Sequence, residues 1–249
     1  MISGSIVALV TPMHLDGGID WQRLDELVEW HVVNGTDGLV PVGTTGESST
    51  VDINEHCEIV KRVVKVVNGR IPVIAGTGAN ATKEAIELTR AAKNAGADAC
   101  LLVTPYYNKP TQEGLYQHYR AIAAAVDLPQ ILYNVPSRTA CDMLPATVAR
   151  LAELDQVIAI KEATGNIDRA REILALCKTP IMIFSGDDET AVELMLAGAS
   201  GTISVTANVA PAEMAKICRL LREGKIDEAR ALDQRLLGLH RNLFLESNP

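Results

Sequence analysis

The sequence predicts one (β/α)8 barrel, and three observations support that fold class. Eight short apolar runs recur along the 249 residues, each ending in a small or polar cluster. The runs are continuous rather than alternating, which is typical of strands buried on both faces of a parallel sheet. Amphipathic segments of helical period separate them. The seven intervals between Ile6 and Thr202, where the first and last runs begin, average 28 residues, which favours a closed barrel over an open sheet.

The eight expected strands are rich in Val, Ile and Leu, as buried strands are. They are expected at Ile6–Val10, Gly38–Val42, Ile71–Ala75, Ala99–Val103, Gln130–Tyr133, Val157–Ile160, Ile181–Phe184 and Thr202–Val205. The active site of such a barrel lies at the carboxyl ends of the strands, in the loops that follow them. The polar clusters after the strands are therefore the place to look for function.

The expected helices begin near capping residues or prolines, and several end at Asn or Gly. Asp20, Asn54 and Thr82 are the expected N-caps of the first three. The helices are expected at Trp21–Val33, Glu55–Val67, Lys83–Asn94, Gln112–Val126, Pro145–Leu154, Ile167–Cys177, Glu189–Leu196, Pro211–Arg222 and about Ile226–Phe244.

Composition excludes several classes of protein. The net charge is −8 and no Lys/Arg run occurs, so a nucleic-acid-binding surface is not expected. No apolar run approaches the roughly 18 residues of a membrane span, and Ile6–Val10 is too short for a signal peptide. The five cysteines are isolated and form no Cys-x-x-Cys pair, which is typical of reduced packing residues. We therefore expect a cytoplasmic protein.

The most informative stretch runs from Val157 to Thr164, because a lysine closes its apolar run. Burying an ammonium group is costly, so Lys161 should either pair with an acid or lose its proton. A neutral amine is a nucleophile toward carbonyl groups. Taken alone, pairing with Glu162 or exposure to solvent is the simpler interpretation. The other strand ends favour a catalytic lysine.

Two more strand ends carry groups for chemistry. Tyr133 offers a phenol for proton transfer, and Arg138 offers a bidentate fork for a carboxylate. The Gly43–Glu47 loop, Gly-Thr-Thr-Gly-Glu, suits an anion, although a tight turn would explain it equally well. Tyr106 and Tyr107 bring the phenols at the rim to three of the chain's five tyrosines, which is unusual for core filling.

Metal chemistry is not expected, because the five histidines are scattered without a ligand motif. His31, His56 and His118 fall in expected helices, outside the barrel. Asp187 to Glu189 is more simply a helix cap than a cation site.

Three motifs together resemble the pyruvate-dependent class I aldolase family: Ile160–Gly165 around Lys161, the Gly43–Glu47 loop and Tyr133–Arg138. The resemblance covers nearly the whole chain. Pro105–Asn108 and Arg138 narrow it to the branch that condenses pyruvate with L-aspartate-4-semialdehyde to 4-hydroxy-tetrahydrodipicolinate, in lysine and diaminopimelate biosynthesis. It implies a lyase without metal or organic cofactor, because the lysine itself is the electrophilic catalyst.

The resemblance also implies the catalytic roles. Lys161 attacks the ketone of pyruvate to form an iminium ion, which loses a methyl proton and becomes an enamine. The enamine adds to the aldehyde, and transimination frees the lysine. Tyr133 shuttles protons through Thr44 and Tyr107. In the family, the tyrosine that matches Tyr107 enters the site from the neighbouring subunit.

Four further residues are implied to bind substrate. Thr45 holds the carboxylate of pyruvate, and Arg138 holds the carboxylate of the incoming aldehyde. Gly186 and Ile203 line the pyruvate pocket.

Some members of the family bind lysine as a feedback inhibitor at a cleft between subunits. The matching positions here are Ser48, Ser49, His56, Asn80, Glu84 and Tyr106. Residue 53 is Ile, where inhibited members often carry His, so lysine inhibition stays open.

In the family the chain continues through further C-terminal helices. We expect residues 1–224 to form the catalytic barrel and residues 225–249 to be a remnant of that helical region. The expected assembly is a homo-oligomer, a dimer of dimers, and the shortened extension bears on its packing.

Two other interpretations remain. A sibling aldolase, such as an N-acetylneuraminate lyase or a 2-keto-3-deoxy-sugar acid lyase, would share Lys161 and Tyr133 but should not need Arg138. A non-catalytic barrel could keep the scaffold alone. The joint presence of Lys161, Tyr133, Thr44, Tyr107 and Arg138 argues against it.

Overall fold

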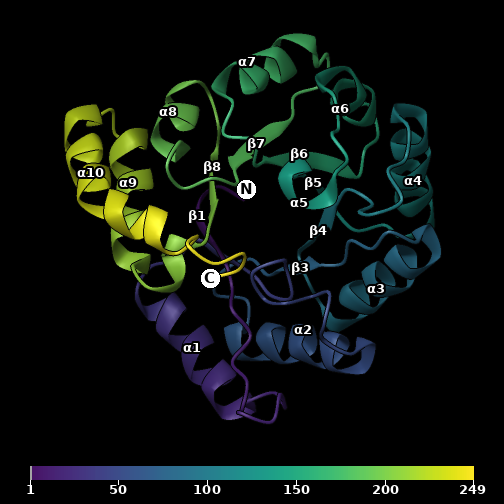
Figure 1. The fold of residues 1–249 in the computed structure, drawn as a ribbon, viewed down its shortest axis with the longest axis horizontal. Helices are drawn as coiled ribbons and strands as arrows, with labels where there is room; N and C mark the ends of the chain where they lie inside the picture. Colours follow the sequence, from purple (N-terminus) through teal and green to yellow (C-terminus); the bar gives the residue numbers. More distant parts are fainter. Residues whose placement is uncertain (1) are drawn as a thin grey trace.

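The computed structural model describes residues 2–249 and confirms the barrel (Figure 1). Eight parallel strands stand side by side in the order β2-β1-β8-β7-β6-β5-β4-β3. A bridge between Leu39 and Val73 joins the two end strands and closes the ring. The strands are β1 (Gly4–Ala8), β2 (Gly38–Val40), β3 (Ile74–Gly76), β4 (Ala99–Val103), β5 (Gln130–Asn134), β6 (Val157–Glu162), β7 (Met182–Ser185) and β8 (Gly201–Ser204).

Helices surround the barrel, as Figure 1 shows. They are α1 (Trp21–Val33), α2 (Ile53–Val67), α3 (Thr82–Ala95), α4 (Gln112–Ala125), α5 (Pro136–Thr139), α6 (Pro145–Leu151), α7 (Ile167–Leu176), α8 (Ala191–Leu196), the 3₁₀ turn η1 (Thr206–Asn208), α9 (Pro211–Arg222) and α10 (Ile226–Asn242). Every helix that the sequence predicts is present, and α5 is an addition.

Two predicted helix caps are wrong. Asp52, not Asn54, caps α2, because its carboxylate accepts a hydrogen bond from the amide of Asn54. Thr82 is the first residue of α3 rather than its cap, and its hydroxyl lies 2.9 Å from Nδ1 of His118 instead. The third strand begins at Ile74, later than predicted. Asp20 caps α1 as predicted.

The strands bury side chains on both faces, and this decides where Lys161 points. Ile131 and Ala159 belong to an apolar cluster inside the barrel, whereas Leu132 and Ile160 pack in a second cluster with helix residues outside it. Side chains alternate along a strand. Lys161 therefore faces the interior and Glu162 the exterior, so the interpretation that these two residues pair is wrong.

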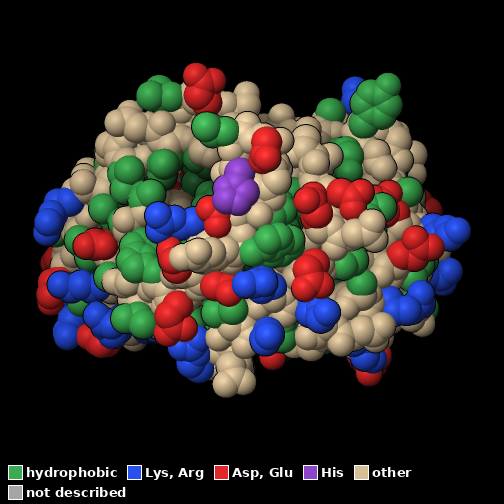
Figure 2. Space-filling view, turned by 90° about the horizontal axis from the view of Figure 1, so that it is seen from below, with side chains coloured by type: hydrophobic (Ala, Val, Ile, Leu, Met, Phe, Trp, Pro, Cys, Tyr) green, Lys and Arg blue, Asp and Glu red, His purple; other side chains and the backbone are tan. Residues whose placement is uncertain are grey.

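The C-terminal helix is part of the outer layer. Helix α10 packs against α9 and α8, and the chain then turns back over the barrel, where its end lies near the centre of the view in Figure 1. None of the helices within residues 2–249 is long and apolar enough to cross a membrane. On the face drawn in Figure 2, acidic and basic side chains are interspersed rather than gathered by sign.

The five cysteines are free, and Cys100, Cys141 and Cys218 are buried. Burial raises the pKa of the Cys100 and Cys218 thiols to about 12. Thiols held in this way are unreactive, which agrees with a packing role.

Two buried histidines should make the fold sensitive to acid. Burial lowers the pKa of His31 and His118 to about 4, against an ordinary value of about 6.5. The folded chain binds fewer protons between these values than the unfolded chain. The free energy of unfolding should therefore fall as the pH drops from about 6.5 to about 4, by up to about 1.4 kcal/mol per pH unit for each histidine.

Urea unfolding between pH 7.5 and pH 4.5 measures this slope. A variant with His31→Gln and His118→Gln should show a flatter pH dependence. An unchanged slope in that variant would assign the acid sensitivity to other groups.

Candidate active site

Lys161 and Tyr133 stand opposite each other on neighbouring strands inside the barrel. They are register partners between β5 and β6, and Nζ of Lys161 lies 4.4 Å from the centroid of the Tyr133 ring. The lysine is 4% exposed and the tyrosine 5%. The amine of Lys161 is thus largely screened from water, yet it borders an open cavity at the carboxyl ends of the strands.

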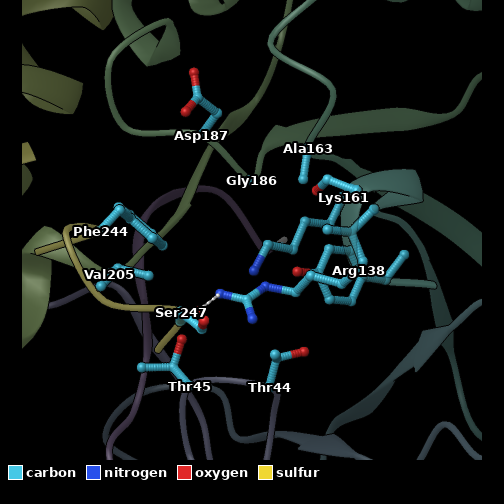
Figure 3. A pocket seen from close by; sticks show the side chains of 13 residues that line it. Thr44, Thr45, Arg138, Lys161, Ala163, Gly186, Asp187, Val205, Phe244 and Ser247 are labelled. Carbon is cyan, nitrogen blue, oxygen red and sulfur yellow. Dashed lines mark hydrogen bonds between the residues drawn. The ribbon is translucent and has the colours of Figure 1, made fainter. Parts of the chain in front are cut away.

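That cavity has a volume of about 380 Å³. It is lined by residues from six separate segments, listed here in chain order: Thr44, Thr45, Tyr133, Val135, Ser137, Arg138, Lys161, Ala163, Gly186, Asp187, Val205, Phe244 and Ser247. In Figure 3 the amine of Lys161 and the guanidinium of Arg138 both point into the space, with Thr44 and Thr45 below them. A cavity of this size holds a small molecule, and the guanidinium of Arg138 favours one that carries a carboxylate.

Gly186 is required by the stem of the lysine. A Cβ at this position would lie 2.8 Å from Cε of Lys161 and 2.6 Å from Cβ of Ala163. Both contacts are shorter than van der Waals distance, so a side chain here would displace the stem of Lys161. The predicted role of Gly186 in the pocket thus has a steric reason.

The Gly43–Glu47 loop presents its two threonines to the cavity from a tight turn. The amide of Glu47 donates to the carbonyl of Thr44 at 3.0 Å. The hydroxyl of Thr11 donates to the carbonyl of Gly46 at 2.7 Å, buried beneath the loop. Glu47 itself adopts a positive φ of 61°. The tight-turn interpretation is therefore confirmed, and this turn presents Thr44 and Thr45 to the cavity. The anion-binding interpretation stays a prediction.

Arg138 has a partner that the sequence did not reveal. Its Nη2 donates to the carbonyl of Ser247 at 2.6 Å, the dashed contact in Figure 3. Nδ2 of Asn248 donates to the carbonyl of Thr45 at 3.4 Å. The segment after α10 thus lies across the mouth of the cavity and orients the guanidinium. No local sequence pattern predicts a contact between residues 109 positions apart.

Two predicted site residues lie elsewhere in this chain. Tyr107 is 89% exposed, with a positive φ of 73°, and does not line the cavity. Ile203 is fully buried in the apolar cluster inside the barrel. The residue near the end of β8 that lines the cavity is Val205, two positions further on.

Five of the six candidate effector residues share a second cavity of about 270 Å³: Ser48, Ser49, His56, Glu84 and Tyr106. The sixth, Asn80, borders this group, because its Nδ2 donates to the carbonyl of Tyr106 at 3.3 Å. A third cavity of about 240 Å³ is lined both by Ser48, Ser49 and Tyr106 and by the active-site residues Thr44 and Arg138. The candidate effector site therefore adjoins the candidate active site.

Charged and polar ligands for a metal are not assembled here. Within residues 2–249, His, Cys, Asp and Glu side chains form no group of three or more that could hold a metal ion. Asp187 instead caps the turn before α8, accepting from the amide of Thr190 at 3.1 Å.

Comparison with known proteins agrees with this geometry. The family model described as "Dihydrodipicolinate synthetase family" matches residues 1–249. The chain belongs to the dihydrodipicolinate synthetase family. A curated member, the 4-hydroxy-tetrahydrodipicolinate synthase of Ectopseudomonas mendocina, is 63% identical over the whole chain, which covers 85% of that protein.

Solved structures of the family superpose closely. The dihydrodipicolinate synthase of Acinetobacter baumannii, complexed with pyruvate, is 57% identical with a TM-score of 0.98, and the match covers all of this chain and 86% of that one. The enzyme from Cyanidioschyzon merolae, with lysine bound, is 38% identical with a TM-score of 0.96, covering all of this chain and 85% of that one. The predicted family and enzyme class are thereby confirmed.

Proposed function

We propose that this chain condenses pyruvate with L-aspartate-4-semialdehyde to give 4-hydroxy-tetrahydrodipicolinate, through an iminium ion on Lys161. The observation that carries the proposal is the buried amine of Lys161 beside Tyr133 at the edge of the cavity. An amine that is shielded from water and faces a small polar space is placed to capture a ketone. The activity by which the curated relatives are named supports the same reaction.

The steps follow from the positions of the residues. Nζ of Lys161 adds to the ketone carbon of pyruvate, and water leaves as the C=N bond forms. The iminium ion draws electrons from the methyl group, so a methyl proton is lost and an enamine results. The enamine carbon attacks the aldehyde, whose oxygen takes up a proton. The amine of the aldehyde substrate then displaces Nζ and closes the ring, which regenerates the lysine.

The groups around the amine divide between proton transfer and binding. Tyr133 is the aromatic hydroxyl nearest Lys161 in the cavity and carries the protons, with Thr44 beside it. Thr45, at the end of the tight turn, holds the carboxylate of pyruvate. Gly186 leaves room for the lysine stem. Arg138 receives the carboxylate of the aldehyde, in exchange for the carbonyl of Ser247.

Replacing Arg138 with alanine should mainly weaken the second substrate. A guanidinium–carboxylate pair typically contributes about 1.5–3 kcal/mol. We expect KM for aspartate-semialdehyde to rise roughly 10- to 100-fold, while trapping of pyruvate on Lys161 by borohydride stays near the wild-type rate. Steady-state kinetics with each substrate varied in turn measures the split. An equal loss in trapping would make Arg138 structural.

Arg150 offers a matched control for that variant. It is an arginine on α6 whose guanidinium pairs with Glu113 at 3.0 Å on the outer surface. Arg150→Ala should leave both kinetic constants unchanged.

The function is tested by offering the enzyme both reaction types. Condensation of pyruvate with aspartate-semialdehyde should proceed, while cleavage of N-acetylneuraminate or a 2-keto-3-deoxy-sugar acid should be slower by orders of magnitude. The reverse preference would assign the chain to a sibling aldolase. Binding of pyruvate without any turnover would favour the non-catalytic barrel.

Assembly and regulation are part of the proposal. We propose that the exposed Tyr107 enters the site of a neighbouring subunit, in a homo-oligomer that is a dimer of dimers. Lysine is the proposed effector of the cavity at Ser48, His56 and Glu84, as the lysine-bound relative suggests. Titrating activity with lysine decides this point.

Free, partly buried thiols suit the reducing cytoplasm, where we expect the enzyme to act.

A further inference from the structure

The turn after β8 forms a wall of the cavity and is held from behind by a buried carboxylate. Val205 borders the cavity on the side away from the stem of Lys161 (Figure 3). Oδ2 of Asp188 accepts from the amides of Val205 at 3.0 Å and Thr206 at 2.8 Å. Asp188 is only 3% exposed. Two amide hydrogen bonds to one carboxyl oxygen fix the position of the turn.

The same turn is tied to the C-terminal helix by a second contact. The hydroxyl of Thr206 lies 2.7 Å from Nδ1 of His240, and both side chains are buried. Nε2 of His240 lies 3.4 Å from Oδ1 of Asp233. The carboxylate favours a proton on Nε2, which leaves Nδ1 to accept from the threonine hydroxyl. A chain of polar contacts thus runs from α10 to the cavity wall.

We infer that Asp188, Thr206 and His240 are positioning residues that hold two walls of the keto-acid pocket against Lys161. Asp188 lies two residues after Gly186, which touches the stem of the lysine. Its carboxylate therefore connects the loop behind the nucleophile with the turn that carries Val205. His240 fixes the far side of that turn. None of the three lines the cavity, so they act through Val205 and Gly186.

Small displacements at such a wall have large kinetic effects. A shift of about 1 Å between reacting groups can lower a rate by roughly 100-fold. Loss of the Thr206–His240 bond leaves a buried imidazole nitrogen without its partner, which favours a displaced turn. The inference rests on the proposed function, because the wall matters only if Lys161 captures a keto acid.

The test compares two buried threonine–histidine hydrogen bonds at opposite ends of the barrel. Thr206→Val removes the hydroxyl that His240 binds, while Thr206→Ser keeps it. The control is Thr36→Val, because the hydroxyl of Thr36 lies 3.1 Å from Nδ1 of His31 and both residues are buried. Thr36 precedes β2 and so lies at the end of the barrel opposite the cavity.

Each variant is assayed at a temperature where circular dichroism shows it folded. Three quantities are compared: the rate of borohydride trapping with pyruvate, KM for each substrate, and the melting temperature. We expect Thr206→Val to trap pyruvate about tenfold more slowly, with KM for the aldehyde unchanged. Thr206→Ser should stay within about twofold of wild type. The melting temperature of Thr36→Val should fall by a similar amount, while its rate of borohydride trapping should not change.

Trapping by Thr206→Val within twofold of wild type, or an equal reduction in Thr36→Val, would overturn the inference. His240→Phe provides a second variant, since it keeps a ring while removing the accepting nitrogen, and it should slow trapping in the same way. Failure of the wild-type protein to trap pyruvate would instead contradict the proposed function. The ratio of the trapping rate of a variant to that of the wild type tests only the positioning role.

Discussion

Lys161→Ala should lower kcat by roughly 10⁴- to 10⁶-fold, the scale seen when a covalent nucleophile is removed. The reason is chemical, because no other amine borders the cavity within the described residues 2–249. Without the C=N bond, the methyl protons of pyruvate keep their ordinary acidity, and no enamine forms. The variant should fold, since the neighbouring acid does not depend on the lysine for its contacts. Glu162 faces the other side of the strand and bonds Asn134 and Thr164.

Mass spectrometry after treatment with pyruvate and borohydride measures the covalent step directly. Wild type should gain one reduced pyruvyl group on Lys161, and Lys161→Ala should gain none. Lys161→Arg keeps a long basic side chain, but a guanidinium forms no iminium ion, so this variant should be equally inactive. Lys178, an exposed lysine after α7, is the matched control, and Lys178→Ala should be modified like wild type. Modification of Lys161→Ala would remove the basis of the proposed mechanism.

The sequence was sufficient to predict the barrel and the position of Lys161 within it, because both depend on local periodicity. Continuous apolar runs at regular spacing predict buried parallel strands. The alternation of side chains then places Lys161 inside and Glu162 outside once the inner residues of β6 are known. The errors at Asn54 and Thr82 have a related cause. Several residues near a helix start can cap it, and tertiary contacts such as Thr82 with His118 decide which one does.

The contacts that complete the site could not be predicted in this way. Arg138 meets the carbonyl of Ser247, and Thr206 meets His240, across long stretches of chain. Backbone carbonyls carry no sequence signal, and a histidine on a helix looks like any other until its neighbour is known. Val205, just beyond the end of β8, lines the cavity, whereas Ile203 lies within the strand and is buried inside the barrel. The apolar run alone does not show which of its residues reaches the cavity. The local sequence pattern thus points to the candidate reactive side chains, while the residues that form the walls of the cavity follow from the closed fold.

Tyr133→Phe should lower kcat by about 10²- to 10⁴-fold, the usual contribution of a positioned acid–base group. The ring that packs against Lys161 is kept, and only the hydroxyl is lost. Iminium formation should slow less than deprotonation of the methyl group, because the amine itself is still present. The informative measurement is therefore exchange of the methyl protons of pyruvate in D₂O, followed by NMR. We expect exchange to become undetectable while borohydride still traps pyruvate.

A second buried tyrosine provides the control. Tyr119 is fully buried on α4, and its hydroxyl donates to the carbonyl of Leu102 at 3.1 Å, outside the barrel. Tyr119→Phe loses a phenol of similar burial and should unfold at a lower temperature with exchange unchanged. If both variants slowed exchange alike, the loss would reflect packing. If Tyr133→Phe exchanged normally, proton transfer would have to be assigned to another group in the cavity, with Thr44 next to be tested.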